Sequence, residues 1–596
     1  MADNLLGRIG DLLQRRQWYE LPRLLAMPRL IEMRNTLREK NLHDTQEPPF
    51  VKEEIPPDLD PRLRDERTVE GTHNDLHYPK MGSVGARFGR NFPLENVFPV
   101  TADLLTPSPR LVSRELMTRE VFKPATVLNL MAASWIQFMV HDWFVHKTAP
   151  PRDGIEIPLA PGDDWATPPM KVGRSIPDAA PDGSTRPPAY LNQNSHWWDA
   201  SQVYGTERAL AARLRSGQGG KLKVDASGLL PVDPDTGIDF TGFSDNWWVG
   251  LAMLHTLFTL EHNHICDRLA ALQPAWTDDQ IYAKAKLINS ALLAKIHTLE
   301  WTCAIVPHPV IKIAMKANWS GLAGEDLQEV FEFLDDKEIL GGVLGSAADH
   351  HAAPYSLTEE FVAVYRMHPL IPDAVTFRSL SSGAVLETQE LPALAGKKTR
   401  ALVSRVSMPD LFYSFGVSHP GAITLHNFPR HLQNLELDNG ERFDLAAVDI
   451  LRDRERGVPR YNQFRRLLGK GPVKSIDELT DNPAWRQQIR RVYNNDLEKV
   501  DLMTGLFAEP LPEGFGFSET AFRIFVLMAS RRLKSDRFFT DDYRKEVYTE
   551  FGIDYIRQNS MLTLLTRHFP ALRPALEGVE NAFAPWRPVA PSRGGN

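Results

Sequence analysis

The sequence predicts a mainly α fold with little β structure. Apolar residues recur at helical spacing along most of the 596 residues, which is the primary sequence signal of amphipathic helices. The alternation of helices and strands that is typical of a parallel sheet is missing, and neither an internal repeat nor a glycine-rich phosphate loop can be found. Helices are expected at 124–147, 246–273, 277–304, 325–335, 357–368, 483–506, 518–534 and 540–568.

The stretches between these helices differ in character. Residues 41–110 are rich in proline, aspartate and arginine and predict an extended arm, whereas residues 148–195 predict loops. The run TRALVSRVSM, at 399–408, favours a short β segment. We therefore expect two parts: an N-terminal helical segment with its extended arm at 1–75, and the main domain at 76–596.

Residues 1–40 form a basic segment in a chain whose net charge is −8. Pro22 and Pro28 are expected to divide it into short pieces, because proline breaks a helix interior. The favoured interpretation is a helix packed on the body of the protein; the other is a peripheral contact with an anionic membrane surface. The apolar residues at helical spacing are Leu5, Leu6, Ile9, Leu12 and Leu13.

The composition, 42% hydrophobic and 24% charged, is that of an ordinary globular protein. The negative net charge argues against nucleic acid as a partner. The two cysteines, Cys266 and Cys303, predict neither a disulfide framework nor a thiolate metal site, which fits a reducing compartment. No apolar run reaches the ~18 residues of a transmembrane span, and no secretory signal is recognisable at the N-terminus. We expect a cytoplasmic monomer.

The stretch VYRMHPLIPD, residues 364–373, places Tyr365 and His368 three positions apart. On a helix such residues share one face, so both side chains are expected to point into the same space. Pro369 disfavours the α conformation for the residue before it, so His368 is expected to end the helix. A core tyrosine beside a hydrogen-bonded terminal histidine is the alternative.

The stretch WIQFMVHDWFVHK, residues 135–147, puts Gln137 and His141 four positions apart on an otherwise apolar helical face. Asp142 is rotated by about 100° from His141 around the helix, so one helix can serve two different sites. A core histidine is the alternative.

The stretch NSHWWDASQVYG, residues 194–205, alternates side chains as an extended loop does when it wraps ligands around an ion. Hydroxyl, carboxylate and backbone carbonyl oxygens are hard ligands that suit Ca²⁺. A plain Asx or serine turn is the alternative. The expected calcium ligands are Asp142, Ser195, Trp197, Asp199 and Ser201.

Together the three stretches resemble the peroxidase–cyclooxygenase superfamily of haem proteins, and most closely its fatty-acid α-dioxygenases. The segment LRDRERGVPRYNQFRR, 451–466, is similar to a further shared stretch. The resemblance implies a large helical haem peroxidase-like dioxygenase catalytic domain at 76–596, with haem b and Ca²⁺ as its cofactors.

The resemblance also implies roles for single residues. His368 is expected to be the axial ligand of the haem iron, and Tyr365 to carry a radical near the porphyrin edge. His141 and Gln137 are expected on the other haem face, where His141 moves the peroxide proton. Asn427 is a candidate partner for the second ring nitrogen of His368, since an axial histidine usually needs such an acceptor.

The segment FTLEHNH, 258–264, bears on the branch of the superfamily. Phe258 stands where the peroxidases carry an arginine three residues before the glutamate, here Glu261. Loss of that cation should weaken general peroxidase turnover. Two cysteines cannot build the disulfide-rich module of cyclooxygenases, and 596 residues leave no room for the extra domain of fungal diol synthases. The elimination favours the α-dioxygenases.

Two further segments resemble the part of α-dioxygenases that holds the substrate carboxylate. KIHTLEWT, 295–302, supplies His297 and Thr302. SETAFRIFVLMASRRL, 518–533, resembles the helix that supplies an arginine, here Arg532 or Arg531, of which we favour Arg532. A guanidinium can pair bidentately with a carboxylate.

We therefore expect a haem-dependent fatty-acid α-dioxygenase that converts a long-chain fatty acid and O₂ to a 2(R)-hydroperoxy fatty acid. Hydrogen peroxide or a lipid hydroperoxide is expected to activate it. The enzymatic alternative is a haem peroxidase that oxidises small phenols or halides. An alternative of another class is a non-catalytic haem- or lipid-binding protein.

Overall fold

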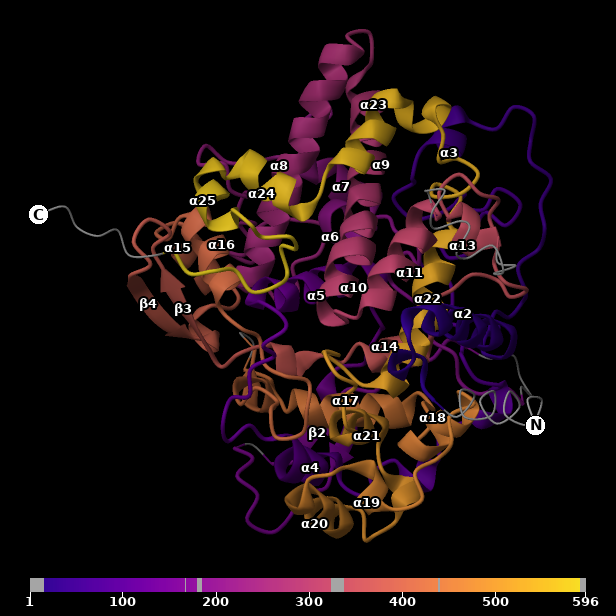
Figure 1. Ribbon diagram of the computed structural model, residues 1–596, viewed down its shortest axis with the longest axis vertical. Coiled ribbons are helices and arrows are strands. Elements are labelled where there is room, and N and C mark those ends of the chain that lie inside the picture. Colours follow the sequence, from indigo (N-terminus) through magenta and orange to yellow (C-terminus); the bar gives the residue numbers. More distant parts are fainter. Residues whose placement is uncertain (1–15, 167, 180–184, 323–336, 438–439, 590–596) are drawn as a thin grey trace, which may run out of the picture.

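The mainly α fold is confirmed by a computed structural model, which describes residues 16–166, 168–179, 185–322, 337–437 and 440–589 (Figure 1). The helices of the first half are α2 (Arg23–Lys40), α3 (Pro61–Asp65), α4 (Pro109–Val112), α5 (Leu130–Trp143), α6 (Ser201–Tyr204), α7 (Arg208–Leu214), α8 (Val249–Leu272), α9 (Asp278–Ile296), α10 (Thr302–Ile305), α11 (Pro309–Ser320), α13 (Lys337–Gly341) and α14 (Glu359–Val364). Those of the second half are α15 (Lys398–Val403), α16 (Met408–Val417), α17 (Leu445–Glu455), α18 (Tyr461–Leu467), α19 (Ile476–Leu479), α20 (Pro483–Val492), α21 (Leu502–Ala508), α22 (Glu519–Ser535), α23 (Lys545–Gln558), α24 (Met561–His568) and α25 (Arg573–Leu576).

β structure is confined to short antiparallel pairs in the part of the chain that the structure describes. They are β1 (Ile155–Ile157) with β2 (Met170–Val172), β3 (Ala374–Arg378) with β4 (Val385–Glu390), and β5 (Leu435–Glu436) with β6 (Arg442–Phe443). None of the described helices is long and apolar enough to cross a membrane.

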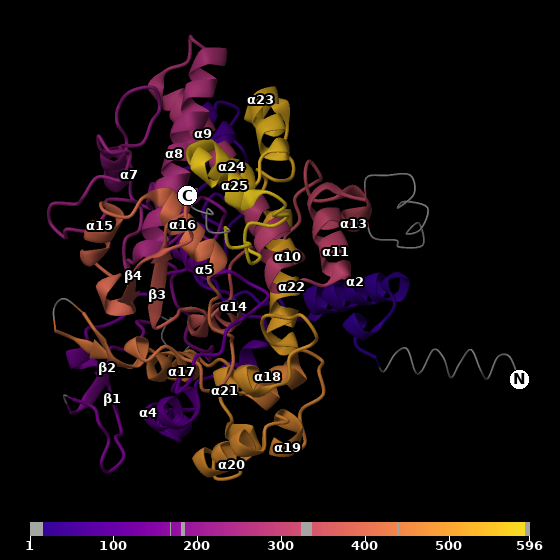
Figure 2. The ribbon, with the colours of Figure 1, turned by 60° about the vertical axis from the view of Figure 1, so that its left-hand side comes forward.

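The centre of the molecule is built on α5, which contacts α8, α6 and α16. Its residues are apolar on nearly all sides, as expected for a helix buried on all sides, and both Trp135 and Trp143 are fully buried. The helix ends at Phe144, whose backbone is extended. In both views α23–α25 lie above this centre and α17–α21 below it (Figures 1 and 2). The chemistry-bearing face of α5 is therefore enclosed by protein.

The N-terminal part of the described chain packs on this body through α2, which contacts α22 and α11. The favoured interpretation, a packed helix, is thus confirmed for Arg23–Lys40, whereas the apolar residues of 1–15 lie outside the described residues. The expected break at Pro28 is wrong, because Pro28 lies inside α2. Its ring removes the hydrogen bond to the carbonyl of Leu24, and that residue is exposed to water, which can replace the lost donor.

The expected boundary at residue 75 stays a prediction. Residues on its two sides are tied together, because Arg67 forms buried ion pairs with Asp199 and Asp536.

Three secondary-structure expectations are wrong. The helix expected at 483–506 is interrupted after Val492, and α21 begins at Leu502. The run 399–408 forms α15 and a turn, and the strands of this region are β3 and β4. The helix expected at 357–368 ends at Val364, and His368 begins a separate 3₁₀ turn. Pro369 explains the early end, because a proline ring clashes with the carbonyl four residues earlier, here that of Tyr365. The helix expected at 325–335 lies outside the described residues.

Candidate active site

A largely apolar cavity of about 770 Å³, its opening included, lies between α2, α11, α14, α22 and the segment after α9. Aliphatic and aromatic side chains such as Ile311, Phe522 and Val526 line most of it. The polar side chains at one part of its wall include His297, Thr302 and Arg532, and Tyr365 lines the same cavity. The structure therefore brings together four residues that the sequence predicted to meet, in a space that suits an acyl chain.

A π-helical segment places the first two of these residues on one face. In a regular α-helix, His297 and Thr302 would point about 140° apart. Residues His297–Trp301 instead form a π-helix between α9 and α10, whose wider turn brings residues five apart into line. Accordingly, the Thr302 hydroxyl donates to the His297 carbonyl at 2.9 Å. The interruption of the helix expected at 277–304 is thus part of the site.

The protonation of His297 is set by a neighbour. The indole N–H of Trp135 donates to His297 Nδ1 at 3.2 Å. Because an indole nitrogen can only donate, Nδ1 is the acceptor and the proton of the neutral ring resides on Nε2. Burial, with a smaller contribution from Arg532, lowers the pKa of His297 well below its ordinary value. His297 is therefore a neutral hydrogen-bond donor to a ligand in the cavity.

The two adjacent arginines of α22 have different surroundings. Arg531 donates to four backbone carbonyls, those of His350, Ala353, Pro354 and Ser356, and does not line the cavity. Arg532 is buried, and its Nε and Nη2 have no hydrogen-bond partner. The carboxylate role considered for Arg531 is therefore wrong, because its donors already cap the chain between α13 and α14. Of the two, only Arg532 lines the cavity, and two of its donor nitrogens are unpaired.

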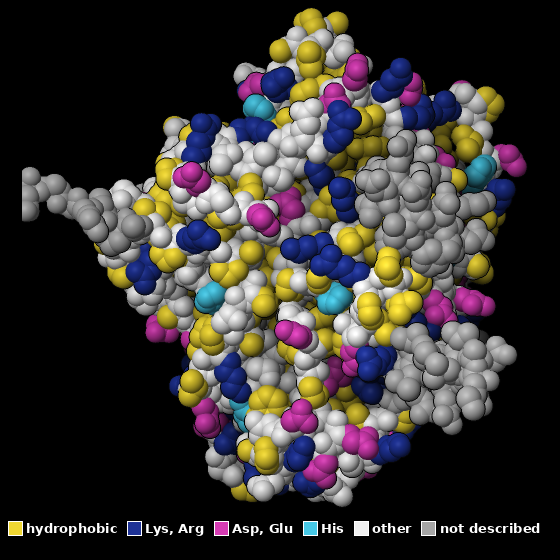
Figure 3. All heavy atoms as spheres, viewed as in Figure 1, with side chains coloured by type: hydrophobic (Ala, Val, Ile, Leu, Met, Phe, Trp, Pro, Cys, Tyr) yellow, Lys and Arg dark blue, Asp and Glu magenta, His cyan; other side chains and the backbone are white. Residues whose placement is uncertain are grey.

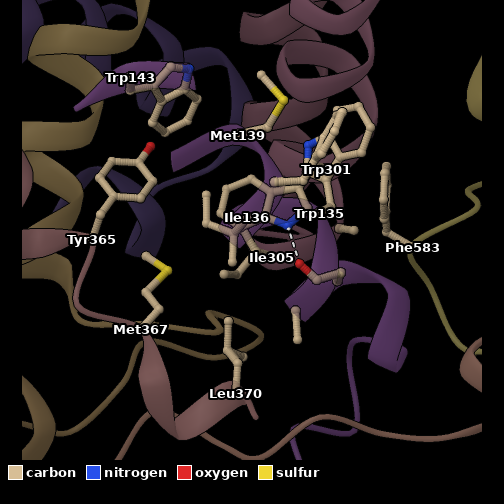
Figure 4. Packing of buried hydrophobic residues seen from close by; sticks show 14 of the residues in the cluster. Trp135, Ile136, Met139, Trp143, Trp301, Ile305, Tyr365, Met367, Leu370 and Phe583 are labelled. Atoms are coloured by element: carbon tan, nitrogen blue, oxygen red, sulfur yellow. Dashed lines mark hydrogen bonds between the residues drawn. The ribbon is translucent and has the colours of Figure 1, made fainter. Parts of the chain in front are cut away.

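Tyr365 is buried among aromatic rings. Its ring centroid lies 4.6 Å from that of Phe361 and 5.3 Å from that of Trp143. Figure 4 shows its hydroxyl directed toward Trp143 of α5, while Met367 lies further along the same chain segment. Burial raises the pKa of the Tyr365 phenol above its ordinary value, so the hydroxyl keeps its proton at neutral pH.

His368 is held from a different element than expected. Its Nδ1 lies 2.8 Å from Oδ2 of Asp449 on α17, close but poorly aligned for a hydrogen bond. The second carboxylate oxygen of Asp449 accepts from Arg366 at 2.6 Å. Asn427, the expected partner, instead donates to the carbonyls of Lys123 and Ala422 and is fully engaged. That assignment is wrong, and Asp449 takes its place.

The imidazole of His368 is one-third exposed, and its Nε2 takes part in no hydrogen bond within the described part of the chain. That nitrogen is therefore free to bind a metal.

His141 and Gln137 lie on α5 but have different environments. His141 is buried, burial lowers its pKa to about 3, and its Nδ1 has no hydrogen-bond partner. It is thus a neutral imidazole. Both ends of the Gln137 amide are engaged, by the carbonyl of Asn246 and the indole N–H of Trp248. A catalytic role for Gln137 beside His141 stays a prediction.

The loop 194–201 lies against the next residue of α5. The backbone N–H of Ser201 donates to Asp142 Oδ1 at 2.5 Å, and the Ser201 hydroxyl is buried without a partner. Ser195 donates to Asp199 at 2.6 Å. The carbonyl oxygen of Trp197 accepts no backbone or side-chain hydrogen bond from the described residues. The loop thus brings Ser201 to Asp142 and Ser195 to Asp199, and a calcium ion shared by all five predicted residues stays a prediction.

The close packing there depends on a glycine. Gly71 has φ +73°, and a side-chain carbon at this position would lie 2.3 Å from the Ser195 hydroxyl and 2.9 Å from Asp199. Only glycine fits.

The chain matches the animal haem peroxidase family over residues 66–580. It is 37% identical to an alpha-dioxygenase of Oryza sativa subsp. japonica, over 89% of this chain and 87% of that protein. The family follows from these matches. The chain belongs to the animal haem peroxidases and, within them, to the alpha-dioxygenases.

Solved structures agree with this placement. The fold superposes with a TM-score of 0.87 and 35% identity on the crystal structure of Oryza sativa fatty acid alpha-dioxygenase, a tyrosine-to-phenylalanine variant with palmitic acid, covering 97% of both chains. The Arabidopsis thaliana enzyme gives the same TM-score at 33% identity, over 98% of this chain and 93% of that one.

As a member of this family the protein binds haem, and its residues fit that cofactor. His368 offers a free ring nitrogen, and His141 is neutral and buried. Where the peroxidases carry a cation, Phe258 packs at 5.6 Å between ring centroids against Trp135 and Phe138. Glu261 accepts hydrogen bonds from Tyr555, Arg567 and His568. It therefore holds α8 against α23 and α24.

Several supporting residues were missed in the sequence. They are Asp449 and Trp135, which orient His368 and His297, and Arg67 and Lys286, which lie near the loop 194–201. A signal existed only for the first: Asp449 and Asp453 are four apart on α17, share a face, and both bind Arg366. The others come from distant segments without a recognisable pattern.

Proposed function

We propose that this alpha-dioxygenase oxygenates the α-carbon of long-chain fatty acids, with Tyr365 as the hydrogen-atom acceptor. The observation that carries the proposal is the cavity, in which an unpaired buried guanidinium, a neutral N–H donor and a tyrosine line one apolar space. Arg532 supplies the charge that a carboxylate needs, and His297 Nε2–H supplies a hydrogen bond. The apolar wall takes the acyl chain.

Anchoring of the acid head determines which carbon reacts. A carboxylate held by Arg532 and His297 keeps the adjacent CH₂ group near Tyr365, whereas more distant carbons extend along the apolar wall. The contribution of the protein is mainly positioning and exclusion of water. Thr302 already donates to the His297 carbonyl, so it can hold a carboxylate only if its hydroxyl rotates.

The oxidising step rests on Tyr365. Haem held by His368 would use hydrogen peroxide or a lipid hydroperoxide to oxidise the phenol of Tyr365 by one electron. The product is a tyrosyl radical. His141 is neutral and could accept the peroxide proton. The Tyr365 radical takes one hydrogen atom from the α-carbon and becomes a phenol again. O₂ adds to the carbon radical, and the peroxyl radical regains a hydrogen atom from Tyr365, which leaves a 2-hydroperoxy acid and restores the radical.

Oxygen uptake tests this proposal directly. The haem-loaded protein with palmitate and a trace of peroxide is expected to consume O₂ and to yield the 2-hydroperoxide and the aldehyde one carbon shorter. Rapid oxidation of guaiacol without palmitate-dependent uptake would favour the phenol or halide peroxidase instead. Bound haem and palmitate with neither activity would favour a non-catalytic binding protein.

A calcium site formed by Asp142, Ser195, Trp197, Asp199 and Ser201 belongs to the same proposal. Burial raises the pKa of Asp142 to about 7, against the opposing hydrogen bond from Ser201. The neighbouring carboxylate of Asp199 also raises the pKa of Asp142, while Arg532 lowers it. A bound cation would stabilise the ionised form of Asp142 beside Asp199 and give the Ser201 hydroxyl a partner.

Metal analysis tests the calcium site. The wild-type protein is expected to retain about one calcium ion after dialysis, as a caged oxygen site does. Asp142→Asn is expected to lose the ion and to lower the melting temperature. Asp164→Asn, at an exposed carboxylate, serves as the control. Equal calcium content in all three proteins would contradict the site.

The proposal extends to the cellular setting: a cytoplasmic monomer with peripheral membrane contact. In α2 the side chains of Leu24 and Leu25 are 58% and 44% exposed beside the exposed Arg23. On the face drawn in Figure 3, hydrophobic side chains are visible where Figure 1 draws α2. Binding to anionic vesicles that is lost in Leu24→Glu/Leu25→Glu is the expected result, and equal binding by both proteins would contradict it.

A further inference from the structure

One tryptophan packs against Tyr365, the proposed radical carrier, and a second packs against the first. The ring centroid of Trp143 is 5.3 Å from that of Tyr365, with the rings nearly perpendicular, and that of Trp198 is 5.7 Å from Trp143. Indoles and phenols are the most easily oxidised aromatic side chains, and electrons move readily between rings in contact. Unless it is opposed, one electron from Trp143 would therefore quench the Tyr365 radical and carry the oxidising equivalent away from the substrate.

The charge of Arg532 opposes that transfer. Its guanidinium carbon lies 4.4 Å from the ring centroid of Trp143 and 4.0 Å from that of Trp198. A cation is attracted to the face of a neutral indole. An indole that has lost an electron is itself a cation, so the same contact becomes repulsive, and the site excludes the water that would screen it.

The proton balance opposes the transfer as well. An oxidised indole is normally stabilised by loss of its N–H proton to an acceptor. Nε1 of Trp143 and Nε1 of Trp198 are both buried without a hydrogen-bond acceptor, so neither proton has a group to receive it. Figure 4 shows the Trp143 nitrogen on the side of the ring away from the Tyr365 hydroxyl. The electron would thus move without its proton and would leave an indole radical cation and a Tyr365 phenolate. Arg532 stabilises that phenolate, but burial disfavours it more strongly, so that the pKa of Tyr365 is raised on balance.

We propose that Arg532, besides holding the acid head, confines the oxidising equivalent to Tyr365 by opposing electron transfer from Trp143 and Trp198. This inference rests on the proposed function, because it presupposes a radical on Tyr365. It assigns a second role to one side chain: the charge that recruits the carboxylate also keeps the radical in place between turnovers.

Electron paramagnetic resonance of the haem-loaded protein, frozen after addition of peroxide without fatty acid, tests the inference. Wild type and Arg532→Lys, which keeps the positive charge, are expected to show a tyrosyl radical. In Arg532→Gln the indole share of the signal is expected to rise at least about tenfold, because the repulsion is gone. Ring-deuterated tryptophan identifies the indole signal, and Arg532→Gln/Trp143→Phe is expected to return to a tyrosyl signal. Haem content is matched by the Soret absorption.

The outcomes separate the two proposals. A wild-type protein that forms no tyrosyl radical would overturn the proposed function, whatever the variants do. A wild-type tyrosyl radical together with an equally pure and long-lived tyrosyl radical in Arg532→Gln would overturn only the confining role. An indole radical in Arg532→Lys equal to that in Arg532→Gln would also overturn it, since the charge would then not be the cause.

Discussion

Arginines around α17 and Arg532 of the cavity are held in opposite ways. Arg366 pairs with Asp449 and Asp453, and Arg454 with Asp501. Arg532 forms no ion pair among the described residues, and its guanidinium lies on the faces of Trp143 and Trp198 with two nitrogens unpaired. A buried charge without a partner costs several kcal/mol of folding free energy. The paired arginines thus avoid that cost, whereas in the proposed function the acid head of the substrate supplies the negative charge that Arg532 lacks.

The largest expected effect tests whether the cavity is where the chemistry occurs. Tyr365→Phe keeps the ring and its packing against Phe361 and removes only the hydroxyl. Palmitate-dependent oxygen uptake is expected to fall by on the order of a thousandfold or more, because phenylalanine cannot replace the phenol as hydrogen-atom acceptor. The Soret absorption and the melting temperature are expected to be unchanged. Uptake at the wild-type rate would show that another group abstracts the hydrogen.

The next effect sharpens the comparison within one helix. Arg532→Ala is expected to raise the KM for palmitate about a hundredfold, because a charge-assisted contact is lost. Its unfolding free energy is expected to stay equal or to rise, since an unpaired buried charge is removed. Arg531→Ala is expected to lose about 3 kcal/mol of unfolding free energy, because four carbonyls lose their donor, with little change in KM. If instead Arg531→Ala raised the KM and Arg532→Ala lowered the unfolding free energy, the two roles would be assigned the wrong way round.

A smaller effect concerns the support of His368. Asp449→Ala is expected to weaken haem binding about 10- to 100-fold, as loss of a partner of a metal-binding histidine does. Asn427→Ala is expected to lower the melting temperature while it leaves haem affinity within a factor of about two, since the Asn427 side chain is bonded to Lys123, Ala422 and Arg119 and not to His368. Haem titration followed at the Soret band measures both. Equal haem loss in the two variants would return Asn427 to the role first expected of it.

The smallest effect concerns Glu300, a carboxylate of the π-helical segment with no ion-pair partner among the described residues. It accepts from the backbone N–H of Met561, while the nearby Lys295 donates to three backbone carbonyls. Burial raises the pKa of Glu300 to about 7. Between about pH 4.5 and pH 7 the folded protein therefore keeps a proton that the unfolded chain releases. The contribution of Glu300 to the free energy of unfolding is fully present below about pH 4.5 and is lost as the pH rises to about 7.

Glu300→Gln removes this dependence and keeps an oxygen that can accept from Met561. Urea unfolding at pH 5 and pH 8 is expected to show about 2 kcal/mol less pH dependence in Glu300→Gln than in wild type. Glu550→Gln, at an exposed residue, serves as the control. Identical pH profiles in wild type and Glu300→Gln would show that the carboxylate is solvated.

The sequence by itself determined the helical class, the family and most of the residues that meet in the site. Periodicity fixed the helices because burial selects one face of each, and short motifs fixed the ligands because their chemistry needs particular side chains. It failed for the helix end at Tyr365, where a steric clash with Pro369 overrides the helical pattern. It also failed for the run 399–408, where a helix forms in place of the expected strand.

Only the tertiary structure decided three further points. Arg531 and Arg532 are adjacent residues of the same type, so the sequence does not distinguish them. They differ only because Arg531 contacts backbone carbonyls and Arg532 contacts indole rings. His297 and Thr302 share a face only because a π-helical turn replaces the α-helical one. Asp449 replaces Asn427 beside His368 because α17 packs there. In each case the partner comes from a distant segment or from a local change of helical pitch, and neither leaves a pattern in the order of the residues.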